Sequence, residues 1–135
     1  KWRLLTNWNN CSSFKQNNKL DDLINKLRVF SNERDWDQFH SPKNLIMALT
    51  SEVGELSDIF QWLSEEQSKI ENIDSKSLEK TKEEIADVFL YILRIADKLN
   101  IDLEREAVKK IRINAEKYPI ELSKGNSVKY NRRNE

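Results

Sequence analysis

The stretch from Ser41 to Leu63 reads SPKNLIMALTSEVGELSDIFQWL, and it decides the fold class of this chain. Ser41 is a preferred N-cap residue and Pro42 suits the first helical position, so we expect a helix to begin here. Beyond that start, apolar residues recur every three or four positions, as one face of an amphipathic helix requires. These residues are Leu45, Ile46, Leu49, Val53, Leu56, Phe60 and Leu63.

Three more segments show the same helical period. One precedes the stretch above: it runs from Leu20 and fades between residues 32 and 35, so the helix at 41–63 is the second along the chain. The third helix runs from about residue 78 to residue 99, after a polar connection at 65–77. The fourth starts at Asp102, another good N-cap, and stops at Tyr118, because the residue before a proline is pushed out of helical geometry. The chain also holds only two glycines and two prolines, which favours long helices.

Four amphipathic helices with short connections predict an all-α chain folded as an antiparallel four-helix bundle. The second and third helices are apolar over a wide arc, so we expect burial on two sides and assembly into dimers or tetramers. Residues 19–122 form the expected helical domain. Residues 1–18 are expected to be an N-terminal arm or tail, and residues 123–135 a polar C-terminal tail.

Composition excludes several classes of function. Lys plus Arg equals Asp plus Glu at 23 each, so no overall basic field favours nucleic acid. No apolar run approaches the roughly 20 residues that a membrane-spanning helix needs. The single cysteine, Cys11, cannot form an intrachain disulfide and fits a reducing compartment. We therefore expect a cytoplasmic protein that binds neither nucleic acid nor membranes.

Four carboxylates stand inside the most apolar segments of the sequence, where solvated charges are least expected. Glu52 and Glu55 are three residues apart in the second helix, and Glu84 and Asp87 are three apart in the third. Each pair projects from one side of its helix, about one turn apart. Solvated helix faces would be the ordinary explanation of either pair alone, but two such pairs on consecutive helices favour a shared site.

Four carboxylates that converge would repel one another strongly unless a cation lay between them. Mg²⁺ prefers carboxylate oxygens and often shares its shell with substrate phosphates, and Mn²⁺ is expected to substitute for it. A di-iron site is excluded because it needs Glu-x-x-His pairs, and the only histidine, His40, is not in one. Gly54, a costly residue inside a helix, suggests a close backbone approach nearby.

The two motifs resemble those of the MazG-like all-α nucleoside triphosphate pyrophosphohydrolases. The flanking segments look most like the dCTP pyrophosphatase branch, and the resemblance covers about residues 20–130. Any one of the matching segments is weak evidence, but their order and spacing together are specific. These segments are residues 33–40, 42–45, 52–56, 60–62, 84–87, 113–114 and 117–119.

The resemblance implies an oligomer, usually a tetramer built from tight dimers, in which the four carboxylates bind Mg²⁺ and serve in catalysis. It also implies a base-binding set and a phosphate-binding set of side chains. The base would contact Trp36, His40, Trp62 and Tyr91. The phosphates would contact Lys110, Asn114 and, more weakly, Lys117.

Each carried-over residue also has a structural alternative. Tryptophans such as Trp36 and Trp62 are more often core or interface residues than stacking platforms, Tyr91 suits a core, and His40 would serve to cap the second helix. Lys110 would serve as an ordinary surface lysine. Glu116 departs from the arginines that are frequent in the family at this place, and a carboxylate there would weaken the grip of this helix on phosphate.

The expected function is Mg²⁺-dependent hydrolysis of a (deoxy)nucleoside triphosphate, dCTP or a related or modified dNTP, to the monophosphate and pyrophosphate. A metal ion would make water easier to deprotonate and neutralise charge on the phosphoryl group. The alternatives are a non-catalytic helical oligomer that senses nucleotides or binds a protein, and a purely structural dimer. Base preference, the number of metal ions and the identity of the general base stay open.

Overall fold

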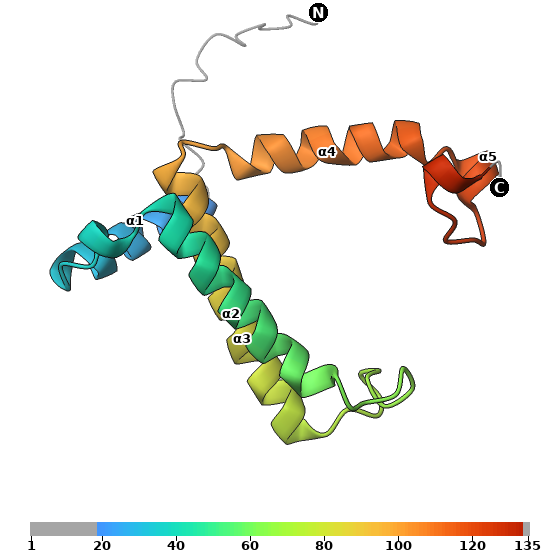
Figure 1. The fold of residues 1–135 in the computed structure, drawn as a ribbon, viewed down its shortest axis with the longest axis horizontal. Helices are drawn as coiled ribbons and strands as arrows, with labels where there is room; N and C mark the ends of the chain where they lie inside the picture. The colour runs from blue at the N-terminus through green and yellow to red at the C-terminus, as the bar shows by residue number, and fades with distance from the viewer. Residues whose placement is uncertain (1–18, 134–135) are drawn as a thin grey trace, which may run out of the picture. The chain divides into compact units, whose positions relative to one another are not determined.

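The computed structural model describes residues 19–133, and every regular element in that range is a helix (Figure 1). The all-α prediction is therefore confirmed. The arm expected at residues 1–18 lies outside the described residues, as do residues 134 and 135. The elements are α1 (Lys19–Glu33), η1 (Asp37–Phe39), α2 (Pro42–Phe60), α3 (Ser75–Lys98), α4 (Leu103–Lys117), α5 (Ile120–Ser123) and η2 (Tyr130–Arg132).

The starts of the helices follow from their N-caps. The Ser41 hydroxyl accepts a hydrogen bond from the Asn44 amide at 3.2 Å, and Asp102 accepts one from the Arg105 amide at 3.0 Å, both as expected. Helix α3 begins at Ser75, three residues earlier than the apolar pattern predicted. Asp74 caps it by accepting from the Ser77 amide at 2.9 Å. A hydrogen bond with the Ser77 side chain, followed by the one from the Ser77 amide, lowers the pKa of Asp74.

Helices α1 and α3 end on a residue in the left-handed conformation, although neither end has a glycine. Asn100 follows α3 with φ of 54°, and Asp35 follows α1 with φ of 53°. The Ile101 amide then donates to the Ala96 carbonyl at 2.8 Å, and the Trp36 amide donates to Ser31 at 2.9 Å. Each of these hydrogen bonds runs to the carbonyl five residues earlier in the chain. It satisfies a carbonyl that the end of a helix would otherwise leave without a partner.

Helices α2 and α3 form the one extensively packed pair of helices among the described residues, joined by the turns of residues 61–74 (Figure 1). The pair is antiparallel, because the start of α2 lies near the end of α3. There the Arg94 guanidinium donates from Nε to Nδ1 of His40 at 3.2 Å. In the described part of the chain, the fully buried apolar residues are Leu45 of α2 and Leu93 and Ala96 of α3.

Each helix of this pair contributes one row of buried and half-buried residues with three- and four-residue spacing. The row on α2 consists of Leu45, Leu49, Glu52, Leu56 and Ile59. The row on α3 consists of Ser77, Thr81, Glu84, Val88, Tyr91, Ile95 and Lys98. A glutamate therefore stands in the middle of each row, at a place where a helical pair normally has an apolar residue.

The chain divides into two compact units, and the boundary between Phe39 and His40 falls inside the domain 19–122 expected from the sequence. In the first unit, the Trp36 ring packs edge-on against Phe30 with ring centroids 5.8 Å apart. The second unit holds the α2–α3 pair and α4. Helix α4 has no buried residue, and within residues 40–133 it does not pack along either α2 or α3.

The segment after α4 makes contacts with the end of that helix. The rings of Tyr118 and Tyr130 meet edge-on at 5.8 Å, and Lys117 Nζ lies 5.2 Å from the centre of the Tyr130 ring. Arg133 donates to the Ser123 hydroxyl at 2.6 Å and to the Lys117 carbonyl at 3.4 Å. Residues 123–133 of the expected polar tail are thus tied to α4.

Across residues 19–133, none of the helices has both the length and the apolarity that a bilayer crossing demands.

Candidate functional site

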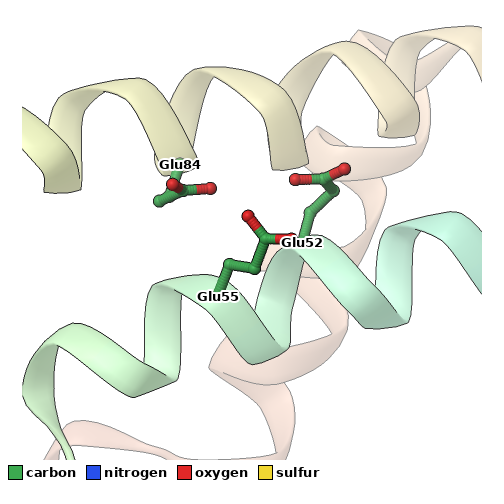
Figure 2. Close-up of side chains that lie close together, drawn as sticks. All are labelled: Glu52, Glu55 and Glu84. Atoms are coloured by element: carbon green, nitrogen blue, oxygen red, sulfur yellow. The ribbon is translucent and has the colours of Figure 1, made fainter.

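Three carboxylates gather in the space between α2 and α3 (Figure 2). Glu52 and Glu55 extend from α2 toward α3, and Glu84 extends from α3 toward them. Each of the three offers an oxygen that lies within 4.8 Å of the other two. The sequence prediction that the acidic motifs of the two helices face one another is realised for these three residues.

The three carboxylates differ in their exposure. Glu52 and Glu84 lie in the half-buried rows of the helical pair, whereas Glu55 is exposed beside them. One oxygen of Glu84, Oε2, is shielded from solvent and has no hydrogen-bond partner. A buried polar atom without a partner is costly, so this oxygen is placed to accept a ligand atom or a cation.

Burial and crowding raise the pKa values of two of these groups above 4.5. For Glu52 the largest cause is desolvation, followed by repulsion from Glu55, Asp87 and Glu84. For Glu84 it is again desolvation, followed by repulsion from Glu55 and Asp87. Both shifts mean that the charged forms are poorly compensated by the protein alone.

Asp87 lies beside the cluster and not within it. Its side chain is exposed, and it does not join the group whose oxygens lie within 4.8 Å of one another. Its charge nonetheless acts on Glu52, on Glu84 and on the half-buried Tyr91, whose hydroxyl pKa is raised by burial and then by Glu52 and Asp87. Tyr91 therefore stands next to the carboxylates, one turn beyond Asp87 on α3.

A groove of about 450 Å³ adjoins the cluster toward the N-terminal end of α3. Glu55 and Glu84 form part of its wall, so the groove opens directly onto the carboxylates. Its remaining lining comes from the last turns of α2 and the first turns of α3. These residues are Asp58, Ile59, Lys76, Ser77 and Lys80.

The other residues predicted to bind a base lie in different parts of the chain. His40 is half-buried just before α2 and is held by Arg94, which also donates to Asp97 at 3.0 Å. Trp62 follows directly after α2 and is 86% exposed. Trp36 belongs to the first compact unit and is 46% exposed there.

The residues predicted to bind phosphate are all on α4. Lys110 and Asn114 are exposed, and Lys117 is half-buried against the aromatic contacts at the end of the helix. Within residues 40–133, α4 does not pack along α2 or α3. Packing inside a single subunit therefore does not bring these three residues to the carboxylates. Their role in binding phosphate stays a prediction.

One sequence inference was wrong. Gly54 was expected to mark a close backbone approach, but a Cβ added there would meet no atom of the described residues within 4 Å. Two residues of interest were missed: Lys76 and Lys80 line the groove, whereas the sequence prediction placed Lys76 in the polar connection at 65–77 and gave Lys80 no role. Their four-residue spacing from each other and from Glu84 is the signal that places all three on one face of α3.

Comparison with known proteins shows the family. The sequence matches the model of the MazG-like family over residues 47–132. It is 38% identical to dCTP pyrophosphatase 1 of Rattus norvegicus over 118 residues, which is 87% of this chain and 69% of that protein. It is 36% identical to dCTP pyrophosphatase 1 of Homo sapiens, with the same shares covered.

A solved structure supports the same relationship. A pyrophosphatase from Archaeoglobus fulgidus DSM 4304 superposes with a TM-score of 0.69 at 34% sequence identity, over 76% of this chain and 94% of that one. The chain belongs to the MazG-like family. The names of the two relatives and of the solved structure all describe a pyrophosphatase.

Proposed function

We propose that this protein is a nucleoside triphosphate pyrophosphohydrolase that releases a nucleoside monophosphate and pyrophosphate, with dCTP or a related deoxynucleotide as substrate. The observation that carries the proposal is the convergence of Glu52, Glu55 and Glu84 between two helices, next to a groove whose lining includes two lysines. The family membership and the relatives named dCTP pyrophosphatase 1 support the same reaction.

The cluster fits a hard divalent cation such as Mg²⁺. Its donors are all carboxylate oxygens, they lie within reach of one ion, and the Oε2 atom of Glu84 has no partner in the protein. When bound, the ion would offset the carboxylate charge, act as a Lewis acid toward the substrate's phosphates and make water easier to deprotonate. Asp87 completes the proposed ligand set from the exposed edge of the cluster, and Mn²⁺ is expected to substitute.

The residues of the cluster then have two tasks. They would hold the ion that offsets the charge of the α-phosphate at the mouth of the groove, and one carboxylate takes a proton from the attacking water. The water oxygen bonds to the α-phosphorus, the bond from that phosphorus to the α–β bridging oxygen breaks, and the electron pair leaves on pyrophosphate. Tyr91, beside Glu52 and Asp87, is placed to contact the sugar or the α-phosphate.

Base recognition is proposed for His40, Trp36 and Trp62, in addition to Tyr91. An aromatic face stacks on a base with roughly 1–3 kcal/mol per contact. Arg94 Nε donates to Nδ1 of His40 at 3.2 Å, and this contact holds the orientation of the imidazole ring.

The proposal includes a homo-oligomer, a dimer or a dimer of dimers. Only three apolar side chains are buried in residues 19–133, whereas large apolar residues on α2, α3 and α4 are exposed. So small a core does not stabilise a domain of this size, and apolar surface of this extent marks an interface. An oligomer would also bring Lys110 and Asn114 of one subunit to a neighbour's cluster. A cytoplasmic setting, suggested by the lone cysteine, is part of the same proposal.

The test is product analysis in water enriched in ¹⁸O. A panel of nucleoside triphosphates is incubated with the protein and Mg²⁺, and products are separated by anion exchange and weighed by mass spectrometry. The proposal predicts pyrophosphate without orthophosphate, with one ¹⁸O atom in the monophosphate. Orthophosphate release, or the isotope in pyrophosphate, would contradict attack at the α-phosphorus. Nucleotide binding without any product would favour the non-catalytic alternative.

A further inference from the structure

The groove beside the carboxylate cluster carries two cations that the proposed reaction has not used. Lys76 and Lys80 line it from the first turns of α3, opposite Asp58 and Ile59 of α2. Lys80 is close enough to Glu84 for its charge to act on that carboxylate. The groove is therefore mixed in charge, with its acidic end at the cluster and its basic side on α3.

These two lysines differ from Lys82 of α3 and from Lys69 of the connection between the helices. Lys82 of α3 pairs with Glu79 at 2.6 Å, and Lys69 in the connection pairs with Glu66. In the part of the chain that is described, neither Lys76 nor Lys80 has a carboxylate within 4.0 Å or a side-chain hydrogen bond. Their ammonium groups are thus available to an incoming anion, and a lysine serves phosphate as a mobile point charge.

The order of groups along α3 gives the groove a direction. At a rise of 1.5 Å per residue, Lys80 lies about 6 Å and Lys76 about 12 Å from Glu84 toward the start of the helix. Tyr91 lies on the other side of Glu84, beyond Asp87, and His40 lies further in that direction beside Arg94. Tyr91 and His40 are thus on the opposite side of the carboxylates from the two lysines. Trp62, which follows α2, lies on the lysine side, so this direction of the substrate gives the base to Tyr91 and His40 and not to Trp62 of the same subunit.

We propose that the groove lined by Lys76 and Lys80 binds the β- and γ-phosphates of the substrate and then the departing pyrophosphate. The α-phosphate lies at Glu52, Glu55 and Glu84, and the nucleoside points toward Tyr91. This inference rests on the proposed function and assigns the substrate's direction within the site.

The physical reason is the charge that develops on the leaving group. As the bond from the α-phosphorus to the bridging oxygen breaks, that oxygen and the β-phosphate gain negative charge. A cation held one turn from Glu84 stabilises this charge more than it stabilises the ground state. Lys80 therefore contributes to turnover, and Lys76, further along the groove, contributes mainly to binding of the terminal phosphate.

The experiment compares Lys80→Met and Lys76→Met with Lys80→Arg and with Lys82→Met. The first two remove a groove cation at similar length, Lys80→Arg keeps the charge, and Lys82→Met removes a paired lysine on the outer face of the same helix. With Mg²⁺ at a fixed concentration, kcat, KM and competitive inhibition by pyrophosphate are measured. All three positions are exposed, so circular dichroism and thermal unfolding serve as the folding control.

We expect Lys80→Met to lower kcat at least 10-fold and weaken inhibition by pyrophosphate at least 10-fold. Lys76→Met is expected to raise KM and weaken inhibition with a smaller change in kcat. Lys80→Arg is expected to restore most of both quantities, and Lys82→Met to change neither by more than 2-fold. Unchanged inhibition by pyrophosphate in Lys80→Met and Lys76→Met would overturn the assignment.

Two results separate this assignment from its alternatives. Trp62 lies at the same end of the helical pair, and if the base bound there instead, the lysine variants would change the preference among bases and not the inhibition by pyrophosphate. If the wild-type protein hydrolyses no nucleotide, the proposed function fails. Calorimetry with Mg²⁺ and pyrophosphate then still tests the groove, since binding that Lys80→Met does not weaken rejects it.

Discussion

Replacing Glu52 by Gln is expected to stabilise the metal-free protein while it destroys the function. Glu52 is half-buried in the row that packs on α3, and desolvation, followed by repulsion from three carboxylates, raises its pKa. Glutamine has nearly the same shape and carries no charge. The substitution therefore removes the repulsion without opening a cavity.

The size of the effect follows from the geometry. Glu52 and Glu55 have oxygens within 4.8 Å of each other, and two unit charges at that distance repel by about 0.9 kcal/mol even at the dielectric constant of water. We use this screened value because the cluster is partly exposed to solvent. A gain of about 1 kcal/mol raises the melting temperature by about 4 °C in a protein of this size.

In the presence of Mg²⁺ the wild type is expected to be more stable than Glu52→Gln, the reverse of the order without metal. An ion that binds only the folded state at 100 times its dissociation constant adds about 2.7 kcal/mol of stability. The wild type is expected to gain close to this amount, and Glu52→Gln much less, because one ligand has lost its charge. Turnover by the variant is expected to fall about 100-fold or more.

The assay is thermal unfolding in EDTA and in Mg²⁺ at pH 7.5, at one fixed protein concentration because the protein is proposed to be an oligomer. Glu71→Gln, which removes one exposed negative charge in the connection between α2 and α3, is the matched control. If Glu52→Gln melts at a lower temperature than the wild type in EDTA, the crowding argument is refuted. An equal response of both proteins to Mg²⁺ would refute the metal assignment.

Three further predictions follow from other features. The folded-state pKa values of Glu52 and Glu84 are raised above 4.5, so the metal-free folded state binds protons more tightly than the unfolded state. The cluster's contribution to stability is therefore lost as pH rises above 4.5. Chemical denaturation across pH 4.5 to 8 should show a steeper fall in the free energy of unfolding for wild type than for Glu52→Gln. Gly54→Ala should raise the free energy of unfolding by about 1 kcal/mol, because a helix-interior glycine is replaced where a Cβ meets no atom of the described residues; a loss of stability would reveal a neighbouring subunit at this place. Asn100→Ala should lower it by about 1–2 kcal/mol and Asn100→Gly should not, since residue 100 has a left-handed backbone after α3; equal melting temperatures for the two variants would exclude this strain.

The sequence predicted the helices well where their signals are local. Ser41, Pro42, Asp102 and Pro119 act on the backbone within a few residues, so the start of α2 and both ends of α4 were confirmed. The start of α3 was placed too late, because the prediction followed the apolar pattern and did not use Asp74 as a cap. The left-handed ends at Asp35 and Asn100 carry no glycine and gave no signal.

The site was predictable in part for a similar reason. Glu52 and Glu84 interrupt apolar rows, so their inward position is visible in the helical period, and the packing of α2 on α3 brings them together. The groove was not predictable, since it depends on how the last turn of α2 lies against the first turns of α3. The places of Trp36, Lys110 and Asn114 in a binding site depend on contacts beyond the pair of helices, and a helical period holds no information about those.

The most direct test of the central claim is a Mn²⁺ titration followed by electron paramagnetic resonance, with Mg²⁺ as competitor. Free Mn²⁺ gives a sharp signal that is lost on binding, so the number of sites and their affinity are read together. The account predicts saturable binding per subunit that Mg²⁺ displaces and that Glu52→Gln and Glu84→Gln each weaken at least 10-fold, while Glu71→Gln does not. Binding of the same strength in all four proteins would show that the carboxylates between α2 and α3 do not hold the ion.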